Sequence, residues 1–213
     1  MANAEIKKGE HIFITGMTGS GKSYLAETYL AGEEYVIKLD TKNETEERRN
    51  AKKSPWTGLK ENEDFSVVEH FDDLLECEFK KIIYVPSIEE QTKETYDNFF
   101  KFCYLRQNTN VWIDELMSVC QNAYDCPTWL RACYTRGRSK GVNMWALSQR
   151  PATIPNIILA NSTHFFVFML NQFEDRQKMS KATGQPCMMN KIEKYYFWYY
   201  NISMDNAVKG TLR

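Results

Sequence analysis

The sequence predicts an α/β fold in which a mainly parallel central sheet is covered by helices on both faces. An apolar strand at residues 12–15 leads into a glycine-rich loop, and the residues after the loop have helical spacing. Farther along, continuous apolar segments alternate with amphipathic ones, which is typical of buried parallel strands connected by helices. The length of 213 residues suits one well-packed domain, so we expect a single domain over residues 1–213.

The glycine-rich loop spans residues 16–23 and matches the phosphate-binding pattern G-x-x-x-x-G-K-[ST]. Its residues are Gly16, Met17, Thr18, Gly19, Ser20, Gly21, Lys22 and Ser23, and Tyr24 follows. Glycine allows backbone conformations in which N–H groups point at an anion, helped by the positive end of the helix dipole. Lys22 would bridge the β- and γ-phosphates, and the Ser23 hydroxyl would bind Mg²⁺. Residues 16–24 are therefore the expected nucleotide-binding segment, with ATP and Mg²⁺ as cofactors.

The remaining elements follow from apolar patterns and from turn residues. Strands are expected at 35–39, 80–85, 111–113, 142–147 and 164–169, with a closing aromatic strand at 194–201. Helices are expected after the capping-box spacing Ser87-x-x-Glu90, at about 127–136, and at 173–182. Residues 43–64 are dense in charge and contain Pro55 and Gly58, which predicts a long, exposed loop.

Composition excludes several classes of protein. No apolar run reaches the roughly 20 residues that a membrane span needs. The six cysteines form no C-x-x-C pair, which indicates reduced thiols, and the spacing of Cys120, Cys126 and Cys133 matches no common zinc pattern. The net charge is −1, but residues 1–110 are acidic and the remainder is basic. The basic half fits either nucleic-acid contact or ordinary surface charge.

A second motif narrows the chemistry. The apolar strand at 111–113 ends in Asp114 and Glu115, as a Walker B element with an adjacent acid does. Asp114 would hold Mg²⁺, and Glu115 would orient and deprotonate the attacking water. A water-activating carboxylate beside the metal ligand favours hydrolysis over phosphoryl transfer to a small molecule.

Polar residues flank the next strand, at 142–147, on both sides. Gln149 follows the strand, where it could bond the γ-phosphate or the attacking water. Arg136 and Arg138 precede the strand in a basic cluster with Lys140. One of the two arginines could act as a finger on the nucleotide of a neighbouring subunit, whereas a solvated basic turn is the simpler interpretation for Lys140.

Together these motifs resemble the FtsK–HerA superfamily of DNA-pumping ATPases. The resemblance rests on the phosphate-binding loop, Asp40-x-Lys42-x-Glu44, Ile113-Asp114-Glu115, Arg138-x-x-Gly141 with Gln149-Arg150-Pro151, and Asn171-x-x-x-Asp175-Arg176. Because the sequence shows neither a membrane segment nor an added domain, it resembles in particular the genome-packaging ATPases of tectivirus-like viruses.

The resemblance implies a RecA-like P-loop NTPase fold of the ASCE group and an ATPase that packages double-stranded DNA into a procapsid. It implies a ring of subunits with ATP hydrolysed at their interfaces, Arg138 as the first choice for the finger and Arg136 as the second. The implied partners are double-stranded DNA, other copies of the chain, and capsid or portal-vertex proteins. The implied location is the host cytoplasm or the packaging vertex of the virion.

Three alternatives remain open from the sequence. A filamentous-phage assembly ATPase resembles the chain around the phosphate-binding loop but generally carries a membrane segment. A nucleoside or nucleotide kinase has a similar loop and size, but Asp114-Glu115 and Gln149 count against it. A nucleotide-gated scaffold without activity is disfavoured by the complete set of catalytic residues.

Overall fold

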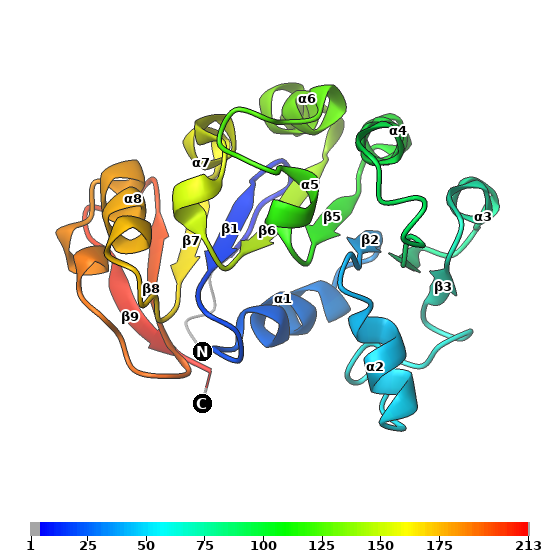
Figure 1. The fold of residues 1–213 in the computed structure, drawn as a ribbon, viewed down its shortest axis with the longest axis horizontal. Coiled ribbons are helices and arrows are strands. Elements are labelled where there is room, and N and C mark those ends of the chain that lie inside the picture. The colour runs from blue at the N-terminus through cyan, green and yellow to red at the C-terminus, as the bar shows by residue number, and fades with distance from the viewer. Residues whose placement is uncertain (1–4, 213) are drawn as a thin grey trace.

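The computed structural model describes residues 5–212 and contains one sheet of nine strands within that range. The strands are β1 (Ile12–Thr15), β2 (Val36–Leu39), β3 (Ser66–Val68), β4 (Lys81–Tyr84), β5 (Asn110–Ile113), β6 (Asn143–Ser148), β7 (His164–Val167), β8 (Tyr196–Asn201) and β9 (Val208–Thr211). Their order across the sheet is β3-β4-β2-β5-β6-β1-β7-β8-β9. Strands β1 to β7 are all parallel, whereas β8 pairs antiparallel with both β7 and β9 at one edge (Figure 1). The predicted mainly parallel α/β sheet is confirmed.

Helices cover both faces of the sheet (Figure 1). On one side lie α1 (Lys22–Ala31) and α2 (Glu44–Asn50); on the other lie α3 (Phe71–Glu76), α4 (Lys93–Arg106), α5 (Leu116–Val119), α6 (Thr128–Arg136), α7 (Asn156–Asn161) and α8 (Phe173–Thr183). Short 3₁₀ turns occupy Gly137–Lys140, Pro151–Thr153 and Pro186–Met189. No helix of the described residues is long and apolar enough to cross a membrane.

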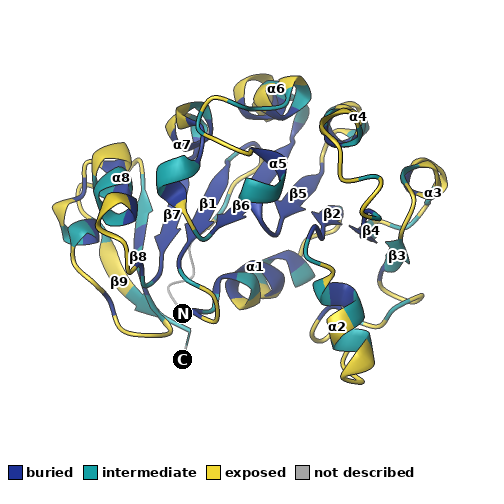
Figure 2. Ribbon diagram, in the orientation of Figure 1, coloured by how far each residue is buried: buried dark blue, intermediate teal, exposed yellow. Residues whose placement is uncertain are grey.

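Two apolar cores flank the sheet, because successive side chains of a strand point to opposite faces. On β1, Phe13 joins the core beneath α4 and α6, while Ile12 and Ile14 join the core beneath α1. Figure 2 shows the central strands buried and the outward helix faces exposed. Burial on both faces explains why these strands are apolar throughout rather than alternating.

The prediction of an exposed loop at residues 43–64 is confirmed only in part: residues 51–64 form no helix or strand and are mostly exposed, but the rest of the segment differs. Residues 44–50 form α2, and Trp56 is fully buried in the core beneath α1. The Trp56 ring packs edge-on against Trp112 of β5, with ring centroids 5.7 Å apart. The charged residues that suggested a loop include Arg48 and Arg49, which form ion pairs with Glu27 and Glu61.

Two predicted boundaries also need correction. Helix α4 begins at Lys93, capped by the Thr92 hydroxyl, and not directly after Ser87. The Ser87 hydroxyl accepts from the Glu90 N–H (3.3 Å), but the Glu90 carboxylate accepts from the N–H of Phe71 (3.0 Å) instead of closing a capping box. The aromatic strand β8 does not close the fold, because β9 follows and pairs with it.

Candidate functional site

The phosphate-binding loop connects β1 to α1 at the carboxyl edge of the sheet, as the motif predicted. The N–H of Gly16 donates to the carbonyl of Ser148 (3.2 Å), and that of Met17 donates to Met169 (2.9 Å). Backbone bonds therefore fix the loop to the chain on both sides of β1. A Cβ at Gly16 would lie 2.5 Å from the Cβ of Phe168, so this position requires glycine.

Lys22 is buried beneath this loop. Its ammonium donates to the carbonyls of Gly16 (2.6 Å) and Met17 (3.0 Å). Burial, together with the nearby charge of Lys42, lowers the pKa of Lys22 to about 8. An added anion would therefore stabilise the charged form of Lys22.

The carboxylate of Asp114 lies at the end of β5, and it is almost completely buried. Its Oδ1 accepts from both the N–H and the hydroxyl of Thr41 (3.1 Å each). Among residues 5–212, its Oδ2 has no hydrogen-bond partner. Burial and the like charge of Asp40 raise the pKa of Asp114 to about 7. An orphaned carboxylate oxygen in this position fits a cation ligand.

Glu115 follows Asp114 and begins α5. Its carboxylate accepts weakly from the N–H of Met117 (3.5 Å) and pairs with Lys42 at 3.2 Å. Lys42 also donates to the backbone carbonyl of Asp114 at 3.4 Å. Lys42, in the turn after β2, therefore contacts both acidic residues of the motif.

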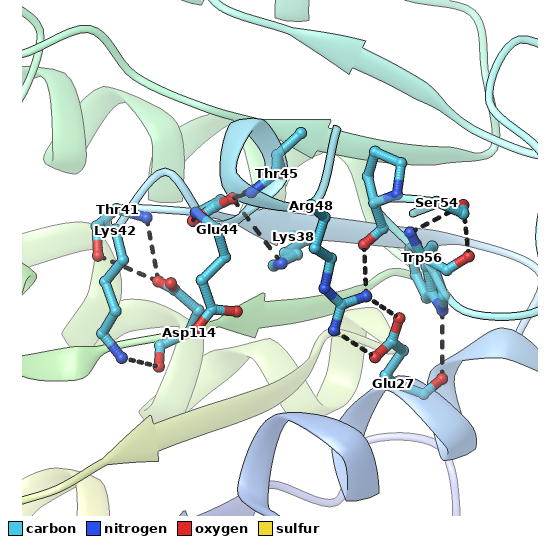
Figure 3. A network of polar contacts seen from close by, with 12 residues as sticks. Glu27, Lys38, Thr41, Lys42, Glu44, Thr45, Arg48, Ser54, Trp56 and Asp114 are labelled. Carbon is cyan, nitrogen blue, oxygen red and sulfur yellow. Dashed lines mark hydrogen bonds and ion pairs between the residues drawn. The ribbon is translucent and has the colours of Figure 1, made fainter. Parts of the chain in front are cut away.

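The turn from β2 to α2 carries Thr41 and Lys42, and Figure 3 shows their contacts with Asp114. The carboxylate of Asp40 accepts from the N–H of Glu44 (3.1 Å) and from the N–H (2.8 Å) and hydroxyl (2.6 Å) of Thr45. Asp40 therefore starts α2 and fixes Thr41 and Lys42 in place between them. Sequence reasoning assigned no role to Thr41 or Lys42; the only signal was the Asp40-x-Lys42-x-Glu44 spacing in the resemblance.

Helix α2 is attached to α1 behind the loop. The guanidinium of Arg48 forms two hydrogen bonds with the carboxylate of Glu27 (2.7 and 3.0 Å), and the indole N–H of Trp56 donates to the Glu27 carbonyl (3.3 Å) (Figure 3). A bidentate arginine–carboxylate pair fixes orientation as well as distance. Through Glu27, the position of α2 depends on the helix that follows the phosphate-binding loop.

Gln149 follows β6, next to β1, and reaches the phosphate-binding loop. Its Oε1 accepts from the hydroxyl of Thr18 at 2.8 Å. The chain beyond it is fixed by Asp175, which is buried and accepts from Arg150 Nε (2.9 Å) and the Ala152 N–H (3.0 Å). The Asn171-to-Arg176 segment of the resemblance therefore holds the loop after Gln149.

The two arginines lie elsewhere. Arg136 ends α6, and Arg138 lies in the 3₁₀ turn before β6, both exposed. They precede β6, whereas Gln149 follows it. The arginines therefore lie at the amino ends of the parallel strands, and the phosphate-binding loop lies at the carboxyl ends. The structure does not bring them to the site of their own chain.

A cavity of about 370 Å³ lies beside the loop. Its lining includes Lys22, Ser23 and Tyr24 at the start of α1, with Glu44, Glu47 and Arg48 on α2. Tyr195, before β8, completes the lining, and sequence reasoning had not placed it there. In the described part of the chain no three His, Cys, Asp or Glu side chains form a metal-binding cluster.

Comparison with known proteins shows which solved structures share this fold. No family model matches the sequence. The genome packaging NTPase B204 of Sulfolobus turreted icosahedral virus 2 superposes with a TM-score of 0.75 over 96% of both chains, at 13% identity. The chain has the fold of a viral genome-packaging NTPase. The DNA-packaging ATPase B204 of Sulfolobus turreted icosahedral virus gives 0.72 at 16% identity, covering 96% of this chain and 98% of that one.

One curated relative supports the same resemblance at the level of sequence. The DNA packaging ATPase P9 of Enterobacteria phage PRD1 is 30% identical over 87 residues. The match covers 37% of this chain and 38% of that protein. The predicted resemblance to packaging ATPases of the P-loop class is confirmed.

The packaging-NTPase fold extends to more distant relatives. ATPases 2 and 3 of EssC from Geobacillus thermodenitrificans give a TM-score of 0.58 at 15% identity, over 93% of this chain and 38% of that one. The N-terminal domain of zonular occludens toxin from Neisseria meningitidis gives a TM-score of 0.54 at 15% identity, over 97% of this chain and 95% of that one.

Proposed function

We propose that this chain is an ATPase that moves double-stranded DNA into a viral procapsid. One observation carries the proposal. The phosphate-binding loop, the Asp114-Glu115 pair and Gln149 converge on one edge of a packaging-NTPase fold. The known proteins with this fold include packaging NTPases solved with the ATP analogues AMPPCP and ATP-gammaS. Residues 16–24 would hold the triphosphate of ATP.

The same edge suits Mg²⁺. The orphaned, buried Oδ2 of Asp114 and the hydroxyl of Ser23 would hold the ion, which supplies charge neutralisation for the phosphates when bound. A bound dication would also lower the pKa of Asp114 from its value of about 7, so that the carboxylate stays ionised at neutral pH. Lys22 would turn from the carbonyls of Gly16 and Met17 to the phosphates.

Hydrolysis requires an oriented water molecule. Glu115 lies directly after Asp114 and would accept the proton of the attacking water. Gln149, hydrogen-bonded to Thr18 in the loop, would contact the γ-phosphate or that water and relay its presence to residues 150–153.

For either arginine to act on a nucleotide, that nucleotide would have to be bound by a second subunit. Arg138 and Arg136 are exposed at the opposite edge from the loop, so neither can stabilise charge on the nucleotide of its own chain. In a ring with head-to-tail contacts, that edge of one subunit faces the nucleotide of the next. Arg138 would then act as the finger in trans, with Arg136 as the second candidate.

The proposed partners are double-stranded DNA, further copies of the chain, and capsid or portal-vertex proteins. The proposed place of action is the host cytoplasm or the packaging vertex. The support is the role of the related proteins in DNA packaging. Contacts with DNA phosphates would be independent of sequence and weaken with salt.

Steady-state ATP hydrolysis tests this function, measured with and without long double-stranded DNA at about 50 and 200 mM salt. We expect DNA to stimulate hydrolysis, with the stimulation fading at the higher salt, and Glu115→Gln to abolish turnover while ATP still binds. Hydrolysis by the Glu115→Gln variant at the wild-type rate would contradict the assigned base. Phosphate transfer to a nucleoside with no response to DNA would favour the kinase instead.

The zonular occludens toxin fold favours one second candidate, an assembly ATPase of filamentous-phage type. Its TM-score of 0.54 is below the 0.75 of the packaging NTPase, and the PRD1 match supports packaging. Hydrolysis that is stimulated by single-stranded but not double-stranded DNA would favour this candidate.

A further inference from the structure

The aromatic run at residues 195–200 is only partly explained by the fold. Phe197 and Tyr199 are buried in strand β8, as a core strand requires. Tyr195 precedes the strand, is 38% exposed, and has a φ of +68°. This left-handed conformation is uncommon for a bulky residue, and it persists only where the surroundings fix it.

Tyr195 is joined to the phosphate-binding loop through Leu212, the residue after β9. Its carbonyl accepts from the N–H of Leu212 at 3.1 Å, and the Leu212 side chain lies directly against Gly21. Figure 1 shows the chain after β9 ending beside the loop between β1 and α1. The Lys194 ammonium lies 4.9 Å from the centroid of the Tyr195 ring, so it covers part of the ring. Tyr195 is therefore a fixed part of the nucleotide edge.

The Tyr195 side chain lines the cavity beside the loop, together with Tyr24. In a P-loop the lysine, here Lys22, reaches the β- and γ-phosphates, and the backbone N–H groups of the loop hold the α- and β-phosphates. Tyr24 and Tyr195 line the same cavity as Lys22 and Ser23, so a sugar and base that continue from the α-phosphate can extend into it toward Tyr195. An aromatic ring in that place offers a π-face to any base.

Charge in the cavity points the same way. Glu47 of α2 lines it, and a carboxylate repels phosphate while it can accept hydrogen bonds from sugar hydroxyls or base amino groups. The guanidinium of Arg48, on the same helix, is already occupied by Glu27. The cavity therefore has a basic side at the loop, where Lys22 lies, and an acidic side on α2, where Glu44 and Glu47 lie, with the Tyr195 ring also in its lining.

We propose that Tyr195 is the stacking platform for the base of the nucleotide. The proposal rests on nucleotide binding at residues 16–24 and adds a residue from the opposite end of the chain. It makes the β8–β9 hairpin part of the nucleotide site. Because stacking does not depend on one hydrogen-bond pattern, Tyr195 sets affinity for the nucleoside portion rather than choice among bases.

The test compares ATP with tripolyphosphate, which lacks sugar and base, by calorimetric titration with Mg²⁺ present. Tyr195→Ala should weaken ATP binding about 5- to 50-fold and change tripolyphosphate binding less than about 2-fold. Tyr195→Phe should bind ATP as the wild type does, because the ring remains. The matched control is Tyr124→Ala, which removes a 94% exposed tyrosine outside the cavity and should leave both affinities unchanged.

Two results would overturn the proposal. Unchanged ATP affinity in Tyr195→Ala would remove the stacking role. An equal loss of ATP and tripolyphosphate binding would mean that Tyr195 only supports the loop structurally. If the wild-type chain binds neither ligand, the proposed function itself fails, which these variants distinguish from failure of the stacking role alone.

Discussion

Lys42 and Glu115 form an ion pair, with Nζ and Oε2 3.2 Å apart, that joins the turn after β2 to the end of β5. The side chain of Glu115 is 9% exposed and that of Lys42 is 30% exposed, so the pair is partly shielded from water. The Glu115 carboxylate contacts the N–H of Met117 on α5 and the ammonium of Lys42 in the turn after β2, and these two partners define its orientation. In the proposed reaction that orientation determines where the attacking water sits.

Replacing Lys42 by methionine should therefore lower kcat for ATP roughly 10-fold and change KM less than about 2-fold, because base positioning acts in the transition state. Lys42→Arg should retain most of the rate. Lys53→Met removes one positive charge from an exposed site in the same segment and is the matched control. A raised KM with unchanged kcat would assign Lys42 to nucleotide binding rather than to positioning Glu115.

The raised pKa of Asp114 predicts a dependence of stability on pH. The folded chain binds this proton up to about pH 7, whereas the unfolded chain releases it near pH 4, so ionisation of Asp114 opposes folding above that range. The free energy of unfolding should fall as pH rises from about 4 through 7. Asp114→Asn should raise it by roughly 2–4 kcal/mol at pH 8 and by little at pH 4.

Urea unfolding at both pH values, without Mg²⁺, measures this effect. Asn retains an oxygen that can accept from Thr41, so the variant removes the charge with little change in shape. Adding Mg²⁺ at pH 8 should stabilise the wild type more than Asp114→Asn. A variant less stable than the wild type at pH 8 would contradict a buried, unpaired carboxylate.

Trp56 should anchor the segment that sequence reasoning took for a loop. Trp56→Ala should lower the free energy of unfolding by about 3–5 kcal/mol, because it empties a fully buried site beneath α1. It should also raise KM for ATP, since Trp56 and α2 share the Glu27 anchor. Trp129→Ala, at a partly buried site on α6, is the control. A loss below about 1 kcal/mol would mean that Trp56 does not anchor the segment.

The strands that carry the site could be predicted because their sequences are apolar throughout. An apolar strand is predicted at residues 111–113, where two acids mark its carboxyl end. A second is predicted at residues 12–15, where the glycine-rich loop marks the carboxyl end. Helix α2 could not be predicted in the same way. Its surface is charged, Thr45 is its one buried residue, and the large buried side chain of the segment, Trp56, lies six residues beyond the end of the helix. A lone aromatic among charges carries no periodicity.

The contacts between residues of the site could not be predicted without the order of the strands in the sheet. Sequence could not show that β2 lies beside β5, and only that neighbourhood brings Lys42 to Glu115. The edge strand β9 was missed because Val208 to Thr211 is short, half exposed and contains Gly210. Consequently the contact of Leu212 with the loop, and the place of Tyr195, became visible only in three dimensions.

The central claim is that one chain supplies Glu115 and the next supplies Arg138 to the same nucleotide. Mixing Glu115→Gln and Arg138→Ala subunits, each inactive alone, tests it by steady-state ATP hydrolysis in the presence of double-stranded DNA. At equal amounts, about a quarter of the interfaces should combine an intact Glu115 with an intact Arg138, so hydrolysis should return to about that fraction. Repeating the mixture with Arg136→Ala tests the second arginine. A mixture as inactive as its components, in subunits shown to assemble together, would contradict a shared site.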